Sequence, residues 1–290
     1  MKNCELKKML RNIYRNVLKL LPAKIVMNIQ NVRGYHKLIN FNNPRYFGEK
    51  IQWLKMYGNL EKYESYVDKY KVREYIKDKI GEEYLIPLIG VYDSQDLIQY
   101  DELPNQFVLK LNNGSGYNLI VKDKNKINYK KTNKVLKKWL KDNYYKINKE
   151  PQYRNIKNKI MCEKYITNCK GLLNDYKFFC FDGEVKYIEV DFDRFEEHKM
   201  NFYDVNWNLQ TFKKGKYGIY KGENNKPKNF NEMIDICRIL SKNFQFVRVD
   251  LYNVDGKIYF GELTFTPASG LTPFYPLTKD LEIAELIKLQ

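Results

Sequence analysis

The stretch VRVDLYNVDGKIYFGELT, residues 247–264, contains two runs of alternating apolar and polar residues around Asp255-Gly256. An Asp-Gly pair between two such runs is a strong indication of a β-hairpin. On a strand, neighbouring side chains point to opposite faces, so Arg248 and Asp250 share one face and apolar residues occupy the other. The stretch therefore predicts a hairpin with one polar face and one apolar face.

The length of the turn decides on which face Glu262 lies. A two-residue loop pairs Asp250 with Gly261 and places Glu262 on the opposite face. A three-residue loop, with a left-handed glycine in a bulge, places Asp250 opposite Phe260 and Glu262 opposite Arg248. We predict the three-residue loop because it leaves one apolar face and gathers two carboxylates and a guanidinium on the other. A two-residue loop without a later bulge would refute this shared face.

The polar face of the hairpin suits a magnesium–phosphate site. Asp250 and Glu262 offer carboxylate oxygens and Thr264 a hydroxyl, which are the hard ligands that Mg²⁺ takes together with substrate phosphates. Arg248 would neutralise phosphoryl charge. Two other interpretations stay open from the hairpin alone: a solvated strand face, and a structural ion pair between Arg248 and Glu262.

A glycine-rich loop forms a second candidate site. Lys110 lies on a predicted strand at 107–112, and Gly114-Ser115-Gly116 follows before another predicted strand at 118–122. Glycines let backbone N–H groups approach phosphate oxygens, and the lysine supplies a fixed positive charge. No helix beginning with Gly-Lys-Ser/Thr follows, so this is no Walker motif. An ordinary hairpin turn remains the alternative.

A third candidate lies at the end of a predicted strand at 159–166. Exposed backbone groups there could pair with an adenine edge, and Glu163 could hold ribose hydroxyls. Taken alone, this segment indicates little.

Composition limits the class of protein. The chain has 290 residues, 43% of them hydrophobic, and no apolar run approaches the roughly 20 residues of a membrane-spanning helix. No signal-peptide pattern is evident at the N-terminus. Five cysteines without CxxC spacing and only two histidines argue against a zinc site and favour a reducing cytoplasm.

The net charge of +16 has two interpretations. One is a polyanionic partner: nucleic acid, an anionic membrane surface or an acidic polysaccharide. The other is compositional bias, because the chain is rich in Lys, Asn, Ile and Tyr and its acidic residues are interspersed with basic ones. No nucleic-acid-binding motif is recognisable, so we expect no nucleic-acid partner.

Residues 5–21 predict an amphipathic basic helix. It could lie on a membrane surface or pack on its own domain. The cysteine content and the N-terminus lead us to expect a cytoplasmic protein. This helix leaves peripheral attachment at the inner membrane face open.

The remaining pattern predicts an α+β protein with more than one lobe. Asp68 is the expected N-cap of one helix and Gly81 its expected C′ residue. The other expected elements are helices at 47–57, 68–80, 129–142 and 231–242, a short buried strand at 84–92, and a hairpin of 176–181 with 184–190.

Along the chain the glycine loop comes first, then the segment at 159–166 and then the hairpin at 247–264. Together and in this chain order, the three candidate sites resemble those of the ATP-grasp family. From about residue 41 onward the chain is similar to the TupA-like branch, which is associated with teichuronopeptide and capsular polysaccharide biosynthesis. Thr264 stands where many ATP-grasp enzymes have asparagine. The stretches that carry the resemblance include FNNPRYFGEKIQWLK (41–55), DKYKVREYI (68–76), FVLKLNNGSGYN (107–118), DYKFFCFDGEVKYIEVDFDR (175–194) and the hairpin extended to 270.

The resemblance implies the ATP-grasp fold, two α+β lobes that sandwich ATP. A helical N-terminal region at 1–95 would lead into a small lobe at 96–168, which carries the phosphate loop. A large lobe at 169–290 would carry the magnesium site.

The resemblance also implies a carboxylate–amine ligase that uses ATP and Mg²⁺ and proceeds through an acyl phosphate. The carboxylate would be a uronic acid of an acidic glycan or sugar nucleotide, and the amine a small amine or amino acid. The implied roles are Mg²⁺ binding by Asp250, Glu262 and Thr264; phosphate binding by Lys69, Lys110, Lys177 and Gly114-Ser115-Gly116; nucleoside binding by Glu163, Lys164 and Ile166; stabilisation of the transferring group by Arg248; and acceptor binding by Arg194 and Ser269.

Alternatives remain open. For Lys69, Lys177, Arg194 and Ser269, a surface or packing role is the other interpretation. A kinase or glycan-transferring enzyme could use the same scaffold, since a fold does not fix a function. A non-catalytic glycan- or membrane-binding protein is the third class.

Overall fold

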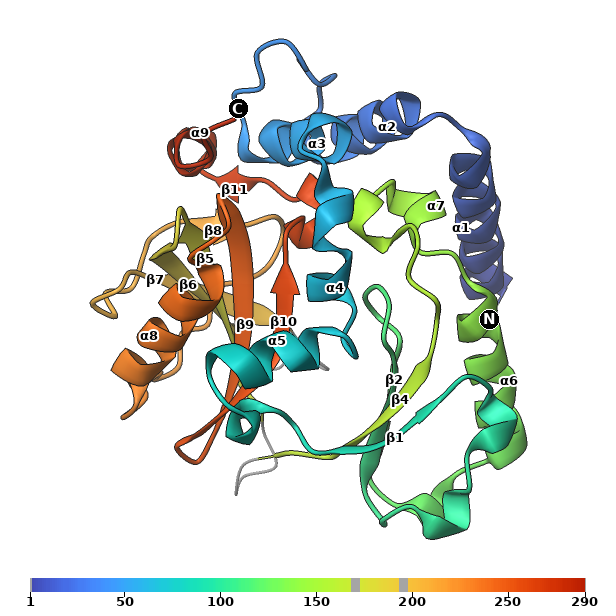
Figure 1. The fold of residues 1–290 in the computed structure, drawn as a ribbon. Helices are drawn as coiled ribbons and strands as arrows, with labels where there is room; N and C mark the ends of the chain where they lie inside the picture. Colours follow the sequence, from blue (N-terminus) through green and yellow to red (C-terminus); the bar gives the residue numbers. More distant parts are fainter. Residues whose placement is uncertain (1, 168–172, 193–197, 290) are drawn as a thin grey trace.

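The computed structural model describes residues 2–167, 173–192 and 198–289. The first N-terminal helix runs along the right-hand edge of the molecule and the next two cross its top, and two separate antiparallel sheets form the two lobes (Figure 1). The expected α+β class with a helical N-terminal region is confirmed.

The N-terminal part consists of α1 (Lys2–Leu20), α2 (Ala23–Tyr35) and α3 (Phe47–Tyr57). The predictions at 5–21 and 47–57 are confirmed, whereas α2 was not anticipated. Glu49 fixes the start of α3, because its Oε2 accepts hydrogen bonds from the backbone N–H groups of Arg45 and Tyr46, at 2.9 and 3.1 Å.

The helix expected at 68–80 begins later. A single turn, α4 (Glu64–Val67), precedes α5 (Val72–Lys79). Asp68 Oδ1 accepts hydrogen bonds from the N–H groups of Tyr70 and Lys71, so Asp68 closes a turn ahead of the helix instead of serving as its N-cap. Gly81 lies in the expected C′ position with φ +114°.

The small lobe is a four-stranded antiparallel sheet in the order β1-β4-β2-β3. One face packs on α6 (Tyr129–Lys141) through Leu136. The strand predicted at 84–92 is shorter and only half-buried, and its pairing with β4 places it in this lobe, ahead of the expected boundary at 96. The strands are β1 (Leu88–Tyr92), β2 (Phe107–Leu111), β3 (Asn118–Val121) and β4 (Ile160–Lys164).

The large lobe is a five-stranded antiparallel sheet in the order β10-β9-β5-β6-β7. One face packs on α8 (Phe230–Ser241), and part of the other face packs on α3 and α9 (Leu277–Glu285) (Figure 1). The strands are β5 (Asp175–Phe181), β6 (Glu184–Phe192), β7 (Lys199–Tyr203), β9 (Phe246–Val254) and β10 (Lys257–Thr264), with β8 (Lys213–Lys214) and β11 (Phe274–Tyr275) as a separate pair.

The β9–β10 hairpin does not have the predicted three-residue loop. Asp255 and Gly256 both have positive φ, +51° and +91°, and form a two-residue loop that pairs Val254 with Lys257. A bulge between Phe260 and Glu262 then shifts the register by one residue. The loop prediction was therefore wrong, but the bulge restores the shared face.

The bulge changes which residues oppose each other. Glu262 lies directly opposite Asp250, and Thr264 opposite Arg248, instead of the predicted pairing of Glu262 with Arg248. Gly261 takes up the bulge, and an added Cβ there would lie 3.0 Å from the carbonyl oxygen of Asp250. A larger residue at 261 would press on the strand that carries Asp250.

A buried carboxylate joins the N-terminal part to the large lobe. Asp280 of α9 accepts hydrogen bonds from Tyr35 Oη–H at 3.0 Å and from the N–H groups of Phe47 and Phe274, both at 2.8 Å. Asp280 is fully buried. It thereby fixes the start of α3 and the strand β11 to the same helix.

We expect Asp280→Ala to lower the free energy of unfolding by roughly 3 kcal/mol or more, because three buried donors lose their acceptor. Urea denaturation followed by circular dichroism measures this. Asp235→Ala is the control, since Asp235 lies exposed on α8 and should change stability by less than about 0.5 kcal/mol. Equal effects of the two substitutions would contradict the assignment.

Candidate active site

Charged side chains converge on one face of the large-lobe sheet. Residues directly opposite each other on neighbouring strands share a face. Lys177 of β5 lies opposite Asp250 on one side and Glu189 on the other, and Asp175 lies opposite Asp191. With the bulge in β10, this face holds Arg248, Asp250, Glu262, Thr264, Lys177, Asp175, Glu189 and Asp191.

Arg248 is the centre of the hairpin part of this face. Its guanidinium binds Asp250 in a bidentate manner, with Nε–Oδ1 at 2.7 Å and Nη2–Oδ2 at 2.6 Å. The same Nη2 lies 3.4 Å from Glu262 Oε1 and donates to Thr264 Oγ1 at 3.2 Å. The three residues predicted to bind metal are therefore gathered around one arginine.

Glu262 connects the two lobes through Lys69. Lys69 Nζ lies 3.6 Å from Glu262 Oε2 and donates to the carbonyl oxygen of Gly114 at 2.5 Å. The backbone N–H of Lys69 also donates to the carbonyl oxygen of Asn112. Burial lowers the pKa of the Lys69 ammonium, and Glu262 opposes this effect. Lys69 thus places a cation, with its side chain 14% exposed, between the glycine loop and the hairpin.

The glycine loop lies where Lys69 meets the small lobe. Gly114 and Gly116 have φ of +72° and +82°. A Cβ on Gly114 would lie 2.4 Å from the ring of Tyr144, so this position requires glycine for space as well as for backbone conformation. Ser115 and Gly116 are exposed at the tip of the loop.

Lys177 is enclosed by carboxylates. Its Nζ lies 2.5 Å from Asp175 Oδ2 and also contacts Asp191 Oδ2, while His198 Nε2 lies 2.9 Å from Asp191 Oδ1. Burial acts to lower the pKa of Lys177, but Asp175, Asp191 and Asp250 outweigh it and raise the pKa. Burial acts to raise the pKa of Asp191, but the charges and hydrogen bonds of Lys177 and His198 together outweigh it and lower the pKa to about 2.

The pKa of Asp250 is shifted upward, opposite to that of Asp191. Burial raises its pKa to about 7 against the pull of Arg248 and Lys177, and Asp175 and Glu262 add to the rise. Burial, with the charges of Asp175 and Glu262, thus outweighs the two neighbouring cations in setting the pKa of Asp250.

The donor set fits Mg²⁺ held jointly with phosphate oxygens. Asp250, Glu262 and Thr264 offer only hard oxygen atoms, and the Glu262 side chain is 33% exposed. Among the residues that the structure describes, no three His, Cys, Asp or Glu side chains form a metal-binding group. Mg²⁺ commonly takes one or two carboxylates and completes its octahedron with phosphates and water, so a preformed cage is not needed.

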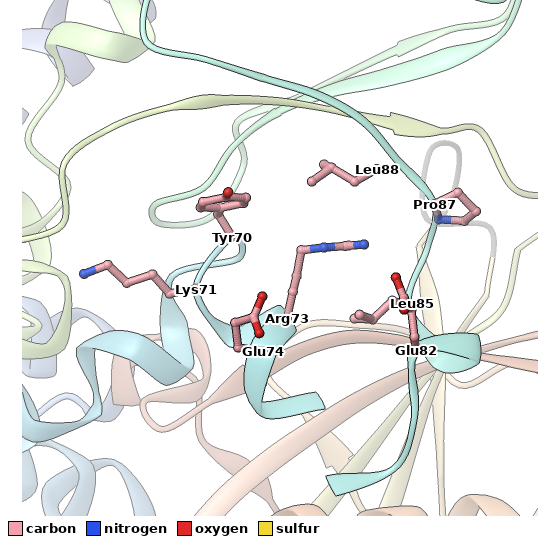
Figure 2. A pocket seen from close by; sticks show the side chains of 8 residues that line it. All are labelled: Tyr70, Lys71, Arg73, Glu74, Glu82, Leu85, Pro87 and Leu88. Atoms are coloured by element: carbon pink, nitrogen blue, oxygen red, sulfur yellow. The ribbon is translucent and has the colours of Figure 1, made fainter. Parts of the chain in front are cut away.

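The third candidate segment lies beside a pocket. Lys110 Nζ pairs with Glu163 Oε2 at 2.5 Å, and Arg73 Nη1 lies 3.6 Å from Glu163 Oε1. Arg73 reaches across a pocket of about 690 Å³ toward Pro87 (Figure 2). The residues predicted to bind the nucleoside therefore adjoin this pocket through Glu163, although the pocket walls are formed by Tyr70, Lys71, Arg73, Glu74, Glu82, Leu85, Pro87 and Leu88.

The remaining predicted residues are less central. Lys164 is exposed at the end of β4, and Ile166 is half-buried just beyond it. Arg194 lies outside the described residues.

Comparison with known proteins now decides the family. The model of the TupA-like ATPgrasp family matches residues 49–288. The chain belongs to the TupA-like ATP-grasp family. No curated protein matches it.

Several solved structures are similar to this ATP-grasp chain. A D-alanine–D-alanine ligase from Bacillus anthracis complexed with ATP has 16% identity and a TM-score of 0.42, covering 77% of this chain and 63% of the ligase. The ATP-grasp ligase PsnB with its minimal precursor has 10% identity and a TM-score of 0.41, with coverages of 70% and 54%. An L-amino acid ligase from Bacillus licheniformis has 14% identity and a TM-score of 0.43, with coverages of 72% and 42%. The chain thus spans less than two thirds of each of these proteins.

A buried polar cluster of Lys55 and Ser269 lies next to the ATP-grasp hairpin. The sequence pattern pointed to Ser269 but not to Lys55. Lys55 of α3 donates to Ser269 Oγ at 2.5 Å and to the carbonyl oxygen of Ser269 at 2.8 Å. Burial lowers the pKa of Lys55 to about 8. Ser269 has φ +55°, so this segment after β10 has a conformation unusual for a non-glycine residue.

A smaller pocket opens beside this cluster. It has a volume of about 330 Å³ and lies between α2, α3 and the segment at 145–154. Its basic wall residues are Lys55, Lys149 and Arg154, and its acidic one is Glu61, 3.3 Å from Arg154. The pocket is therefore suited to an anionic ligand.

Sequence reasoning also missed the charged partners of the site. Asp175, Asp191 and Glu189 alternate with aromatic and aliphatic residues in β5 and β6, a pattern also typical of a solvated face. Lys214 binds Glu189 at 2.6 Å from β8, a two-residue strand that no periodicity reveals.

The raised pKa of Asp250 predicts a pH-dependent stability. A folded pKa of about 7, against about 4 in the unfolded chain, favours folding while Asp250 is protonated, and this contribution is lost as the pH rises toward 7 and above. We expect the wild type to lose stability relative to Asp250→Asn between pH 5 and pH 8, measured by urea denaturation at each pH. A constant difference between the two proteins across that range would contradict the raised pKa.

Proposed function

We propose that this chain is an ATP-dependent carboxylate–amine ligase that forms an amide on a uronic acid of a cell-surface polysaccharide or its precursor. The observation that carries the proposal is the convergence of Arg248, Asp250 and Glu262 with Lys69 and the glycine loop. Phosphoryl transfer depends mainly on positioning and charge stabilisation, and this convergence supplies both from two lobes.

The proposed reaction has two steps. A carboxylate oxygen of the acceptor attacks the γ-phosphorus of ATP, the bond to the β,γ-bridging oxygen breaks, and ADP leaves. The nitrogen of the amine then attacks the acyl carbon of the acyl phosphate, inorganic phosphate leaves with the C–O bond pair, and the nitrogen loses a proton. Mg²⁺ held by Asp250 and Glu262, with Thr264 as a further oxygen donor, would neutralise phosphate charge.

The protein residues act by binding and orientation. Nη2 of Arg248 lies beside Glu262 Oε1 and Thr264 Oγ1. From there it can donate a hydrogen bond to a transferring phosphoryl group. Lys69 and the backbone of the glycine loop would hold the terminal phosphates, and Lys110 and Glu163 would position the nucleoside side. Lys177 contacts Asp175 and Asp191, and its charge also acts on Asp250, so it would help to balance the carboxylates of the face.

Two observations support an acidic acceptor. The chain carries a net charge of +16. The smaller pocket has more basic than acidic wall residues and adjoins Ser269, which follows the hairpin by a few residues.

The first experiment is product analysis. We expect ADP release to require both a uronic acid and an amine, with an amide detected by mass spectrometry. ADP release with a stable phosphorylated glycan would instead support a kinase on the same scaffold. Absence of ATP binding would support a non-catalytic glycan-binding protein and contradict the proposal.

We expect Glu262→Gln to reduce kcat by about 10²–10³-fold, because the variant loses a charged group that holds Mg²⁺ and phosphates during transfer. ADP release under saturating substrates measures the effect. Glu184→Gln removes a carboxylate that is 57% exposed at the start of β6 and should leave kcat unchanged. Full turnover in Glu262→Gln would remove Glu262 from the site.

We expect Arg154→Ala to raise the KM for an acidic acceptor by about tenfold, the value of one charge-assisted hydrogen bond, without raising the KM for ATP. Steady-state kinetics with each substrate varied separately distinguishes the two. Arg238→Ala is the matched control, because Arg238 on α8 is as exposed as Arg154, 47% against 45%. Parallel changes in both KM values would argue against an acceptor pocket.

A further inference from the structure

The helix α1 presents a stripe of apolar side chains to solvent. The described members of the stripe are 49–87% exposed, although they recur at the spacing of one helical face. Large apolar side chains that gather on one exposed face indicate an interaction surface. The members are Met9, Leu10, Ile13, Val17 and Leu20.

The other face of α1 is anchored to the protein. Leu18 is fully buried, and Arg15 and Lys19 lie 4.0 and 3.5 Å from the carboxylate of Asp142. The guanidinium of Arg33 on α2 stacks over Tyr14 at 4.8 Å. The helix is thus already packed on its own domain, and the apolar stripe remains outward after that packing.

The sequence of α1 is strongly basic, and so is that of the neighbouring helix α6. Residues 2–20 contain six lysines and arginines and one acidic residue, Glu5. The helix α6 contains six lysines, all exposed, and no acidic residue: Lys130, Lys131, Lys134, Lys137, Lys138 and Lys141.

The two helices belong to one edge of the molecule. Asp142, which binds Arg15 and Lys19, directly follows α6. Both helices lie along the same edge in Figure 1. An apolar stripe and a bank of lysines therefore adjoin each other.

We propose that α1 and α6 form a docking surface for an anionic membrane, with α1 lying in the plane of the interface. An apolar stripe beside a bank of exposed lysines matches the boundary between acyl chains and anionic headgroups. A soluble polyanion would use the lysines but would have no use for the apolar stripe. A second copy of this chain would bring an equally basic surface against this one, so like charges would oppose pairing. The described part of the chain holds no helix with the length and apolarity to cross a membrane.

Vesicle flotation with the full chain tests the proposal. We expect binding to phosphatidylcholine vesicles that contain about 30% phosphatidylglycerol, an anionic lipid. Binding to pure phosphatidylcholine should be weaker by about tenfold or more, and raised salt should weaken binding to the anionic vesicles. Equal binding to both vesicle types, or binding to neither, would overturn the proposal.

Variants separate the two parts of the surface. The triple variant Ile13→Ser, Val17→Ser and Leu20→Ser should bind anionic vesicles more weakly by about tenfold or more. The variant lacks three apolar side chains that would enter the membrane interface. The matched control Leu97→Ser, Leu209→Ser and Ile239→Ser removes three apolar side chains that are 46–59% exposed elsewhere, and should bind as the wild type does. The variant Lys130→Gln, Lys134→Gln and Lys137→Gln should also bind more weakly and lose part of the salt dependence.

Two further measurements keep the outcome decisive. Thermal unfolding of each variant should stay close to that of the wild type, because the substituted side chains are exposed; a stable triple variant that still binds vesicles as the wild type does would overturn the proposal. Light scattering of the free protein should give a monomer. A dimer that the Ile13, Val17 and Leu20 substitutions dissociate, without any vesicle binding by the wild type, would assign the stripe to self-association instead.

Discussion

Carboxylates crowded on one face of a buried sheet are the constraint on which this structure depends. Within residues 2–167, 173–192 and 198–289, five of them face the same side: Asp175, Glu189, Asp191, Asp250 and Glu262. Burying a charge is costly unless a partner lies nearby, and removing one partner of a buried pair costs about 3–5 kcal/mol. Lys177, Arg248, Lys214 and Lys69 supply these partners from four different elements. The sheet, the β8–β11 pair and the segment before α5 are therefore held together by electrostatics as well as by apolar packing.

The same crowding favours the proposed chemistry. Burial raises the pKa of Asp250 to about 7, and the excess negative charge of Asp175 and Glu262 adds to the rise. A further cation would relieve that imbalance, and a nucleotide phosphate would find Arg248 and Lys69 beside it. Because Lys69 contacts both Gly114 and Glu262, a phosphate bound there would touch groups of both lobes at once. A metal ion and phosphates bound at these side chains would thereby be coupled to the arrangement of the lobes.

Much of the fold follows from local patterns in the sequence. Asp182-Gly183 and Asp255-Gly256 mark their hairpins because both positions of each loop need positive φ. The candidate hairpin was recognised with its correct face but with the wrong loop, since a bulge at Gly261 is a packing outcome that alternation does not encode. The late start of α5 has a similar origin, because the Asp68 side chain caps a turn that tertiary contacts place before the helix.

The candidate site was predictable only in part. Arg248, Asp250 and Glu262 come together as the alternation of β9 and β10 suggests, whereas their union with Lys69 requires the meeting of two lobes. Glu189, Asp191 and Lys214 could not be distinguished in the sequence from residues of a solvated strand. Lys55 and Ser269 are 214 residues apart, and only the packing of α3 against the large lobe brings them into contact.

Asp250 and Glu262 are proposed to hold Mg²⁺ together with the phosphates of a nucleotide. Calorimetric titration of the full chain with a non-hydrolysable ATP analogue, with and without Mg²⁺, tests this proposal most directly. We expect Mg²⁺ to tighten binding of the analogue to the wild type, and Asp250→Asn to abolish this enhancement while the metal-free affinity is retained. Equal enhancement by Mg²⁺ in both proteins would contradict it.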